Sequence, residues 1–156
     1  MRIGFGFDVH AFQAGRPLVL GGVTVPYDKG LAGHSDADVL VHAIMDALLG
    51  ALALGDIGQH FPPGDPAYKN ISSMELLTAV KNLIAEKDAK ICNIDSVIVA
   101  EKPKMAGFIP QMCENIAKTL EVAADCVSVK ATTTEGLGYT GRGEGIAAQA
   151  VVLLDN

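Results

Sequence analysis

The chain has 156 residues, of which 49% are hydrophobic and 19% charged, and its formal net charge is −6. This apolar content suits one packed domain and excludes a wholly disordered chain. The acidic balance, with no Trp and 5% aromatic residues, gives no basic footprint for nucleic acid. Any site for a phosphorylated molecule must therefore be built locally from a metal ion, Lys, Arg or backbone N–H groups.

Neither a membrane span nor a targeting segment is expected. The N-terminus lacks the apolar region of a signal peptide, and the most apolar stretch, 39–54, is interrupted by His42 and Asp46. The three cysteines are far apart and odd in number, which favours reduced thiols over a disulfide framework. We expect a soluble cytoplasmic protein with a single domain over residues 1–156.

The first half of the chain predicts a strand, a hairpin and a helix. Residues 3–10 alternate small and bulky side chains, and Gly21-Gly22 separates two short apolar runs. Apolar residues recur three and four apart over 38–54, which predicts a helix ending near Gly55. The Pro- and Gly-rich residues 55–70 predict a long loop.

The second half alternates predicted helices and strands. Its elements are a helix from Ser72 or Ser73 to about Asp88, a strand over 91–100, a helix over 109–120, and strands over 127–133 and 144–154. This order predicts an α+β fold, an α/β sandwich with a mixed sheet and helices on one face. The last strand is apolar on both faces, so we expect a second subunit to cover the face without helices.

Asp8, His10 and His42 form a candidate metal site. Asp8 and His10 are two apart on a strand and point to the same side, while His42 lies on an apolar helix face and needs a polar partner. Two imidazoles and a carboxylate suit zinc with one open position, and Asp38 or Asp46 is expected to accept the outer N–H of His42. The alternative is that two polar residues end a strand and His42 is a hydrogen-bonded core histidine.

Residues 33–38, Gly-His-Ser-Asp-Ala-Asp, precede the predicted helix. Their backbone N–H groups lie at the positive end of the helix dipole, where His34 and Ser35 can add donors for an anion. The alternative is a simple N-cap by Ser35 or Asp36.

Residues 136–141 match G-x-G-x-x-G by letter. Only 15 residues follow Gly141, and they read as a strand, so no βαβ unit fits and the dinucleotide interpretation is rejected. Hydroxyls of residues 132–134, the backbone and Arg142 can bind phosphate, and Glu135 can bind a hard cation. The alternative is a glycine-rich turn between strands.

Four separated motifs together resemble a known family. Residues 7–10 (FDVH), 33–39 (GHSDADV), 55–58 (GDIG) and 130–145 are similar to those of 2-C-methyl-D-erythritol 2,4-cyclodiphosphate synthases, in the same order and spacing. The similarity covers essentially the whole chain. Because the four motifs occur together, the resemblance is far more specific than any one of them.

The resemblance implies a reaction and an assembly. That family converts 4-diphosphocytidyl-2-C-methyl-D-erythritol 2-phosphate to the 2,4-cyclodiphosphate, a phosphorus–oxygen lyase step of non-mevalonate isoprenoid synthesis that releases CMP. It implies a homotrimer with active sites between subunits, an uncovered sheet face toward the trimer interior, and a central cavity proposed to hold an isoprenoid diphosphate. The partner is a cytidine-diphosphate-linked small molecule, with no nucleic acid and no membrane.

Position by position, the resemblance also implies roles for residues. The metal ligands are Asp8, His10 and His42 for zinc, and Glu135 for Mg²⁺ or Mn²⁺. The residues that stabilise the transition state are His34 and Thr133. The substrate-binding residues are Asp8, His10, His34, Ser35, Asp56, Gly58, Asp65, Ala100, Lys104, Met105, Ala106, Ala131, Thr132, Thr133, Thr134, Glu135, Tyr139 and Arg142, and the cavity positions are Tyr139, Arg142 and Glu144.

One loop departs from the family pattern. The family often has Phe-Pro-Asp-Thr-Asp-Pro where this chain has Phe-Pro-Pro-Gly-Asp-Pro over residues 61–66, so Pro63 replaces a carboxylate while Asp65 is retained. His60 has no expected metal role.

We expect direct metal-assisted cyclisation without a covalent intermediate. The rival hypotheses are a zinc-dependent phosphohydrolase and a ligand-binding oligomer without catalysis.

Overall fold

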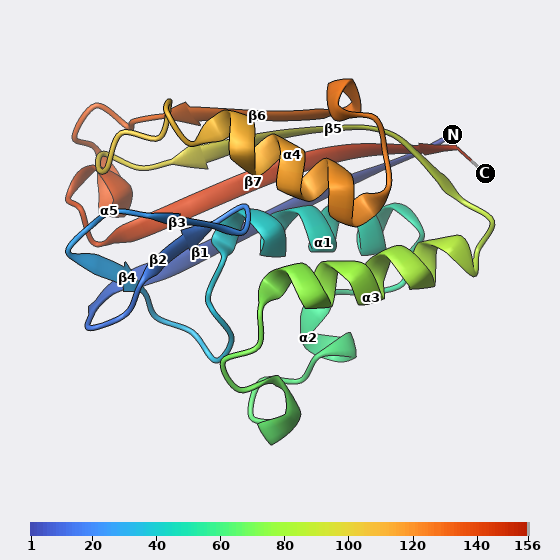
Figure 1. Cartoon of the computed structure of the whole chain (residues 1–156), viewed down its shortest axis with the longest axis horizontal. Helices are drawn as coiled ribbons and strands as arrows, with labels where there is room; N and C mark the ends of the chain where they lie inside the picture. Colours follow the sequence, from blue (N-terminus) through green and yellow to red (C-terminus); the bar gives the residue numbers. More distant parts are fainter. Residues whose placement is uncertain (156) are drawn as a thin grey trace.

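A mixed five-stranded sheet organises the chain in the computed structural model, which describes residues 1–155 (Figure 1). Its strand order is β4-β1-β7-β5-β6, and only β5 and β6 are parallel neighbours. The strands are β1 (Arg2–Ala14), β4 (Lys29–Leu31), β5 (Lys90–Val99), β6 (Val127–Thr132) and β7 (Gly145–Asp155). A separate hairpin pairs β2 (Leu18–Leu20) with β3 (Val23–Val25).

Helices cover one face of this sheet, which confirms the predicted α+β class (Figure 1). The long helices are α1 (Val39–Ala51), α3 (Ser73–Ala85) and α4 (Ile109–Leu120). The short ones are α2 (Ile57–His60), α5 (Gly138–Gly141) and the 3-10 turns η1 (Pro66–Tyr68) and η2 (Ala124–Cys126). The core lies between α1 and the central strands, where every second residue of β7 from Ile146 to Leu154 is buried.

α1 packs against β1 at very short range. A Cβ atom added at Gly4 or Gly6 would lie 1.8 or 1.9 Å from the carbonyl oxygens of Ala47 and Ala43, respectively. Glycine is therefore required at these two strand positions for the helix backbone to approach so closely. The close approach brings the side chain of His42 on α1 to those of the strand residues that follow Gly6.

Several element predictions needed correction. The first strand extends to Ala14 rather than ending at residue 10, and the helix expected over 38–54 spans Val39–Ala51. Residues 55–70 contain two helical turns instead of a plain loop. Lys29–Leu31 was not predicted as a strand, because three residues are too few to show an alternating pattern.

The sheet face away from the helices carries large apolar side chains that this chain does not cover. On β1 they are Ile3 (73% exposed), Phe5 (61%), Phe7 and Val9, and on β7 Val151 is also exposed. We predicted that both faces of the last strand are buried. Within a single chain only the face toward the helices is buried along its whole length, and the other face stays uncovered at Val151. Within residues 1–155, no helix is long and apolar enough to span a membrane.

Candidate metal centre

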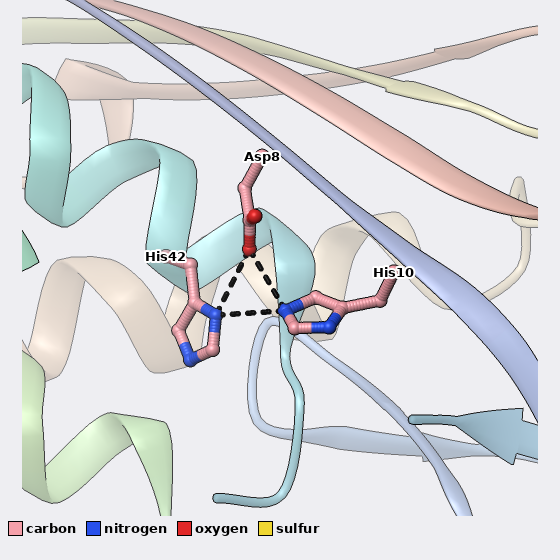
Figure 2. Close-up of side chains that lie close together, drawn as sticks. All are labelled: Asp8, His10 and His42. Carbon is pink, nitrogen blue, oxygen red and sulfur yellow. Dashed lines mark hydrogen bonds and ion pairs between the residues drawn. The ribbon is translucent and has the colours of Figure 1, made fainter. Parts of the chain in front are cut away.

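Asp8 and His10 on β1 and His42 on α1 point toward one another (Figure 2). Asp8 Oδ2 lies 2.9 Å from His42 Nδ1 and 3.0 Å from His10 Nε2. The two ring nitrogens are 3.2 Å apart. Three potential ligand atoms thus meet at one point, as the sequence predicted.

Each imidazole has a polar partner for its other nitrogen. His10 Nδ1 lies 2.6 Å from the carbonyl oxygen of Ala32 and donates to it. His42 Nε2 lies 3.0 Å from Ser73 Oγ and 3.3 Å from Ser35 Oγ. These outer contacts leave the inner nitrogens free to act as ligands.

The acceptor expected for His42 was wrong. Asp38 is fully buried and caps α1, accepting from Val41 N as well as from Gly21 N. Asp46 accepts from the backbone N–H of Ile57. Because the first turn of α1 is capped by Asp38, the alternative interpretation of residues 33–38, an N-cap by Ser35 or Asp36, was also wrong.

The charges in the cluster are strongly coupled. Burial alone raises the pKa of the Asp8 carboxyl, but its contacts with the His10 and His42 imidazoles outweigh burial and leave the pKa well below its usual range. Burial opposes the charged form of His10, yet the Asp8 carboxylate leaves the His10 pKa raised. The cluster therefore favours an ionised carboxylate beside a positive charge, which a proton or a metal ion can supply.

The donor set fits a divalent metal ion such as zinc. Two imidazole nitrogens and a carboxylate oxygen are typical zinc ligands and leave one position for a substrate atom. Their separations of 2.9 to 3.2 Å are close to the roughly 3.3 Å between ligand atoms implied by bonds of about 2.0–2.1 Å to a tetrahedral zinc. Within residues 1–155, this trio is the one cluster of three such ligands.

The trio opens into a cavity of about 220 Å³. Polar and apolar side chains both line it, and the lining residues are Asp8, His10, His34, Ser35, His42, Ile57, Gly58, Phe61, Pro63, Tyr68 and Leu76. This volume is below the roughly 300–1,000 Å³ of a site that encloses a drug-sized ligand. The cavity is large enough for a phosphate group and a short polyol but not for a whole nucleotide.

The remaining predicted residues of this region line the cavity or contact residues that do. His34 lines the cavity, and its Nε2 lies 3.0 Å from the backbone oxygen of Asp65. Asp56 caps α2 beside Gly58, accepting from Gln59 N. The Asp65 carboxylate caps η1, so only its backbone contacts His34.

The predicted cytidine and second-cation residues are on a different part of the chain. The Thr133 hydroxyl donates to Glu135 Oε1 at 3.1 Å, and Glu135 has a φ of +53°. No residue of 100–106 or 131–144 lines the trio's cavity in the part of the chain that the structure describes. A single chain therefore does not bring the two groups of predicted residues together.

Most of these residues are exposed, but two are buried. Ala100 is buried and donates its N–H to Thr132 O, and Met105 is 4% exposed within the core. Thr132, Thr134 and Tyr139 line a second hollow beside Phe7, while Arg142 pairs with Glu144 at 2.6 Å.

Four supporting residues escaped sequence reasoning. Arg16 donates to the carbonyl oxygens of Gly33 and Ser35, and Glu101 accepts from the backbone N–H groups of Thr134 and Gly136. The other two are Asp36 and Ser73, which contact each other behind His42. Asp36 lies within the 33–39 motif, but its contact with Ser73 joins residues that are distant in sequence. Arg16 and Glu101 lie outside the four motifs and contact backbone atoms, and the burial of Ser73 is visible only in the fold.

The fold and the trio define a class: an α+β protein with a triad suited to a divalent metal ion on the helix-covered side of its sheet. The model of the YgbB family matches residues 1–155, and the chain belongs to that family. It is 64% identical over 156 residues to the 2-C-methyl-D-erythritol 2,4-cyclodiphosphate synthase of Clostridium kluyveri, covering all of this chain and 95% of the relative.

Solved structures agree with that membership. The structure of a 2C-methyl-D-erythritol-2,4-cyclodiphosphate synthase in its CDP-bound form has a TM-score of 0.90 at 35% identity, over 99% of this chain and 100% of that one. The bifunctional IspDF from Campylobacter jejuni has a TM-score of 0.95 at 46% identity over 98% of this chain. The chain spans 42% of that bifunctional protein.

Proposed function

We propose that this chain is an enzyme that converts 4-diphosphocytidyl-2-C-methyl-D-erythritol 2-phosphate to 2-C-methyl-D-erythritol 2,4-cyclodiphosphate and CMP, in non-mevalonate isoprenoid synthesis. The observation that carries the proposal is the Asp8, His10 and His42 trio facing a small cavity, in a chain that matches the YgbB family over residues 1–155. It acts as one domain in the cytoplasm.

The reaction is an intramolecular phosphoryl transfer. An oxygen of the 2-phosphate forms a bond to the β-phosphorus, the bond from that phosphorus to the α-phosphate breaks, and CMP carries away the electron pair. Because nucleophile and leaving group belong to one substrate, the protein must mainly fold that substrate and stabilise charge. This needs no nucleophilic side chain.

In the metal cavity, Asp8, His10 and His42 hold zinc, which when bound supplies Lewis-acid polarisation of a phosphate oxygen. His34 and Ser35, on the loop before α1, line the cavity and contact the phosphates. Asp56 and Gly58 contact the erythritol unit, and the apolar lining residues exclude water around it.

The cytidine side of the site is supplied by the other segments. Ala100, Lys104, Met105 and Ala106 hold the base and ribose, together with residues 131–134. Glu135 holds Mg²⁺ or Mn²⁺, which when bound supplies charge neutralisation between the α- and β-phosphates. Thr133 donates a hydrogen bond to the phosphates in the transition state.

These two groups meet when the chain assembles as a homotrimer with sites between subunits. The volume of the metal cavity and the separation of segments 100–106 and 131–144 from it support this arrangement. The uncovered apolar face, which includes Phe5 and Phe7, supplies the contact between subunits. Light scattering is expected to give the mass of three chains, and a stable monomer at micromolar concentration would contradict the assembly.

One assay tests the function. The protein is incubated with the cytidyl substrate, Zn²⁺ and Mg²⁺, and the products are followed by ³¹P NMR. We expect CMP and a cyclic diphosphate in equal amounts. Inorganic phosphate or a linear product would instead indicate a zinc-dependent phosphohydrolase, and binding without CMP release would indicate a non-catalytic receptor.

A further inference from the structure

The outer face of His42 contacts a buried hydroxyl that does not belong to the cavity. Ser73, the first residue of α3, is fully buried, and its Oγ lies 3.0 Å from His42 Nε2. Ser73 does not line the cavity of the metal trio. It is therefore placed to act on His42 from behind rather than on a substrate.

Asp36 takes both hydrogens that Ser73 can offer. The Ser73 hydroxyl donates to Asp36 Oδ1 at 2.5 Å, and the Ser73 backbone N–H donates to Oδ2 at 3.0 Å. A serine hydroxyl has one hydrogen, so toward His42 this oxygen can only accept. The hydrogen between the two residues must therefore sit on His42 Nε2.

This fixes the state of the inner nitrogen. With its hydrogen on Nε2, neutral His42 directs the lone pair of Nδ1 at Asp8 Oδ2, 2.9 Å away. Two electron-rich atoms at that distance repel unless a cation lies beside them. The contact between Asp36 and Ser73 thus prepares His42 to bind a metal ion through Nδ1.

Ser35 does not determine which nitrogen of His42 carries the hydrogen. Its Oγ is farther from His42 Nε2, at 3.3 Å, and accepts from Ala37 N. Within residues 1–155, its hydroxyl hydrogen is not committed to a carboxylate, so the hydroxyl can either donate or accept. Because Ser35 also lines the cavity, it remains available to a substrate phosphate.

We propose that Asp36 and Ser73 are positioning residues that hold His42 in the orientation and tautomer that ligate the metal ion. The inference deepens the proposed function and rests on its assignment of zinc to the trio. A carboxylate behind a ligating imidazole, here acting through a hydroxyl, raises the basicity of the ligand and restricts ring rotation. Sequence alone placed Asp38 or Asp46 in this role, and both are engaged elsewhere.

The rival explanation is that Asp36 merely fastens the start of α3. A matched pair of variants separates the two roles. Ser73→Ala removes the hydroxyl behind His42, whereas Ser72→Ala removes the N-cap of the same helix, which accepts from Met74 N. Both changes weaken the start of α3, but only the first alters the surroundings of His42.

The measurement is the zinc dissociation constant of the purified protein, from competition with a chromophoric chelator at fixed pH. We expect Ser73→Ala to weaken zinc binding by about 10- to 100-fold and Ser72→Ala to leave it unchanged. As a single substitution, Asp36→Ala is expected to weaken zinc binding. Added to Ser73→Ala, it is expected to weaken zinc binding no further. Equal zinc affinity in Ser73→Ala and Ser72→Ala would overturn the proposal.

A second measurement uses the unaltered protein and so does not depend on the folding of a variant. In the zinc-loaded, ¹⁵N-histidine-labelled protein, long-range ¹H–¹⁵N spectra are expected to show His42 protonated at Nε2, with slow hydrogen exchange. A proton on Nδ1, or rapid exchange at Nε2, would refute the role of Ser73. If the unaltered protein binds no zinc at all, the metal assignment in the proposed function fails instead, which is a distinct outcome.

Discussion

The metal trio and the threonine–glycine segment, residues 131–145, contrast in how their side chains are held. The trio lies on a strand and a long helix, and each imidazole has a second hydrogen-bonding partner behind it. The segment includes a turn with Glu135 and Gly136 at positive φ, and the carboxylate of Glu101 accepts from two backbone N–H groups of this turn, those of Thr134 and Gly136. The trio is complete in one chain, whereas the segment presents its polar groups to the outside.

The difference indicates which part of the site depends on assembly. Regular elements with buried partners position atoms without outside help, which suits a metal site. A turn with exposed hydroxyls reaches its working geometry only when something packs against it. We therefore expect changes in the metal half to act on metal content and folding, and changes in the segment to act on rate.

The largest effect is expected from His42→Ala. It removes a metal ligand, so zinc content should fall to background and activity with it. His60→Ala is the matched control, because His60 Nε2 bonds the carbonyl oxygen of Leu54 and His60 is not part of the metal trio, and this variant should keep its zinc. Elemental analysis of the purified variants decides; unchanged zinc in His42→Ala would show that the ligand assignment is wrong.

Gly6→Ala tests whether the contact between β1 and α1 places the ligands. The added methyl group would meet the carbonyl oxygen of Ala43, so we expect a loss of about 3 kcal/mol or more in the free energy of unfolding, together with weaker zinc binding. Gly50, also on α1, has no atom within 4 Å of an added Cβ. Gly50→Ala should instead gain roughly 0.5–1 kcal/mol by helix propensity, as denaturant titration of both variants can show.

The two halves also differ in how much the sequence alone revealed. Period-two and helical patterns located β1 and α1, and the Asp-x-His spacing with a helical histidine identified the trio. The partner of His42 was missed because Ser73 is 31 positions away and meets it only through tertiary packing. In the segment, sequence reasoning rejected a dinucleotide site but could not find Glu101, whose acceptor role depends on backbone N–H groups in a turn.

Glu135→Gln should separate the second cation from zinc. Loss of the charged ligand is expected to lower the rate by roughly 10²-fold and to raise the Mg²⁺ concentration needed for half-maximal activity. Zinc content should not change, since Glu135 does not line the trio's cavity. An unaltered Mg²⁺ dependence would remove Glu135 from the cation site.

Glu101→Ala tests whether one carboxylate holds the segment in place. Glu101 Oε1 accepts from Thr134 N at 3.0 Å and from Gly136 N at 3.2 Å. Losing a charged acceptor of two backbone N–H groups should lower kcat about tenfold, with zinc affinity unchanged. Glu101→Gln keeps an oxygen acceptor and should retain more activity. Equal rates for both variants would indicate that the turn keeps its conformation without this acceptor.

The smallest effect is a pH dependence in the metal half, at Asp38. Burial raises the pKa of Asp38 from 3.8 to about 6, against backbone N–H groups that favour its charged form. The folded protein then binds more protons than the unfolded chain between these values, so this residue's contribution to stability falls as pH rises through the window. In metal-free protein, the unfolding free energy of the wild type minus that of Asp38→Asn should drop on the order of 1 kcal/mol from pH 4 to 6. The subtraction cancels the titration of Asp8 and the histidines, which both proteins share. A difference that stays flat or rises over this range would mean that the N–H groups of the hairpin and of α1 outweigh burial at Asp38.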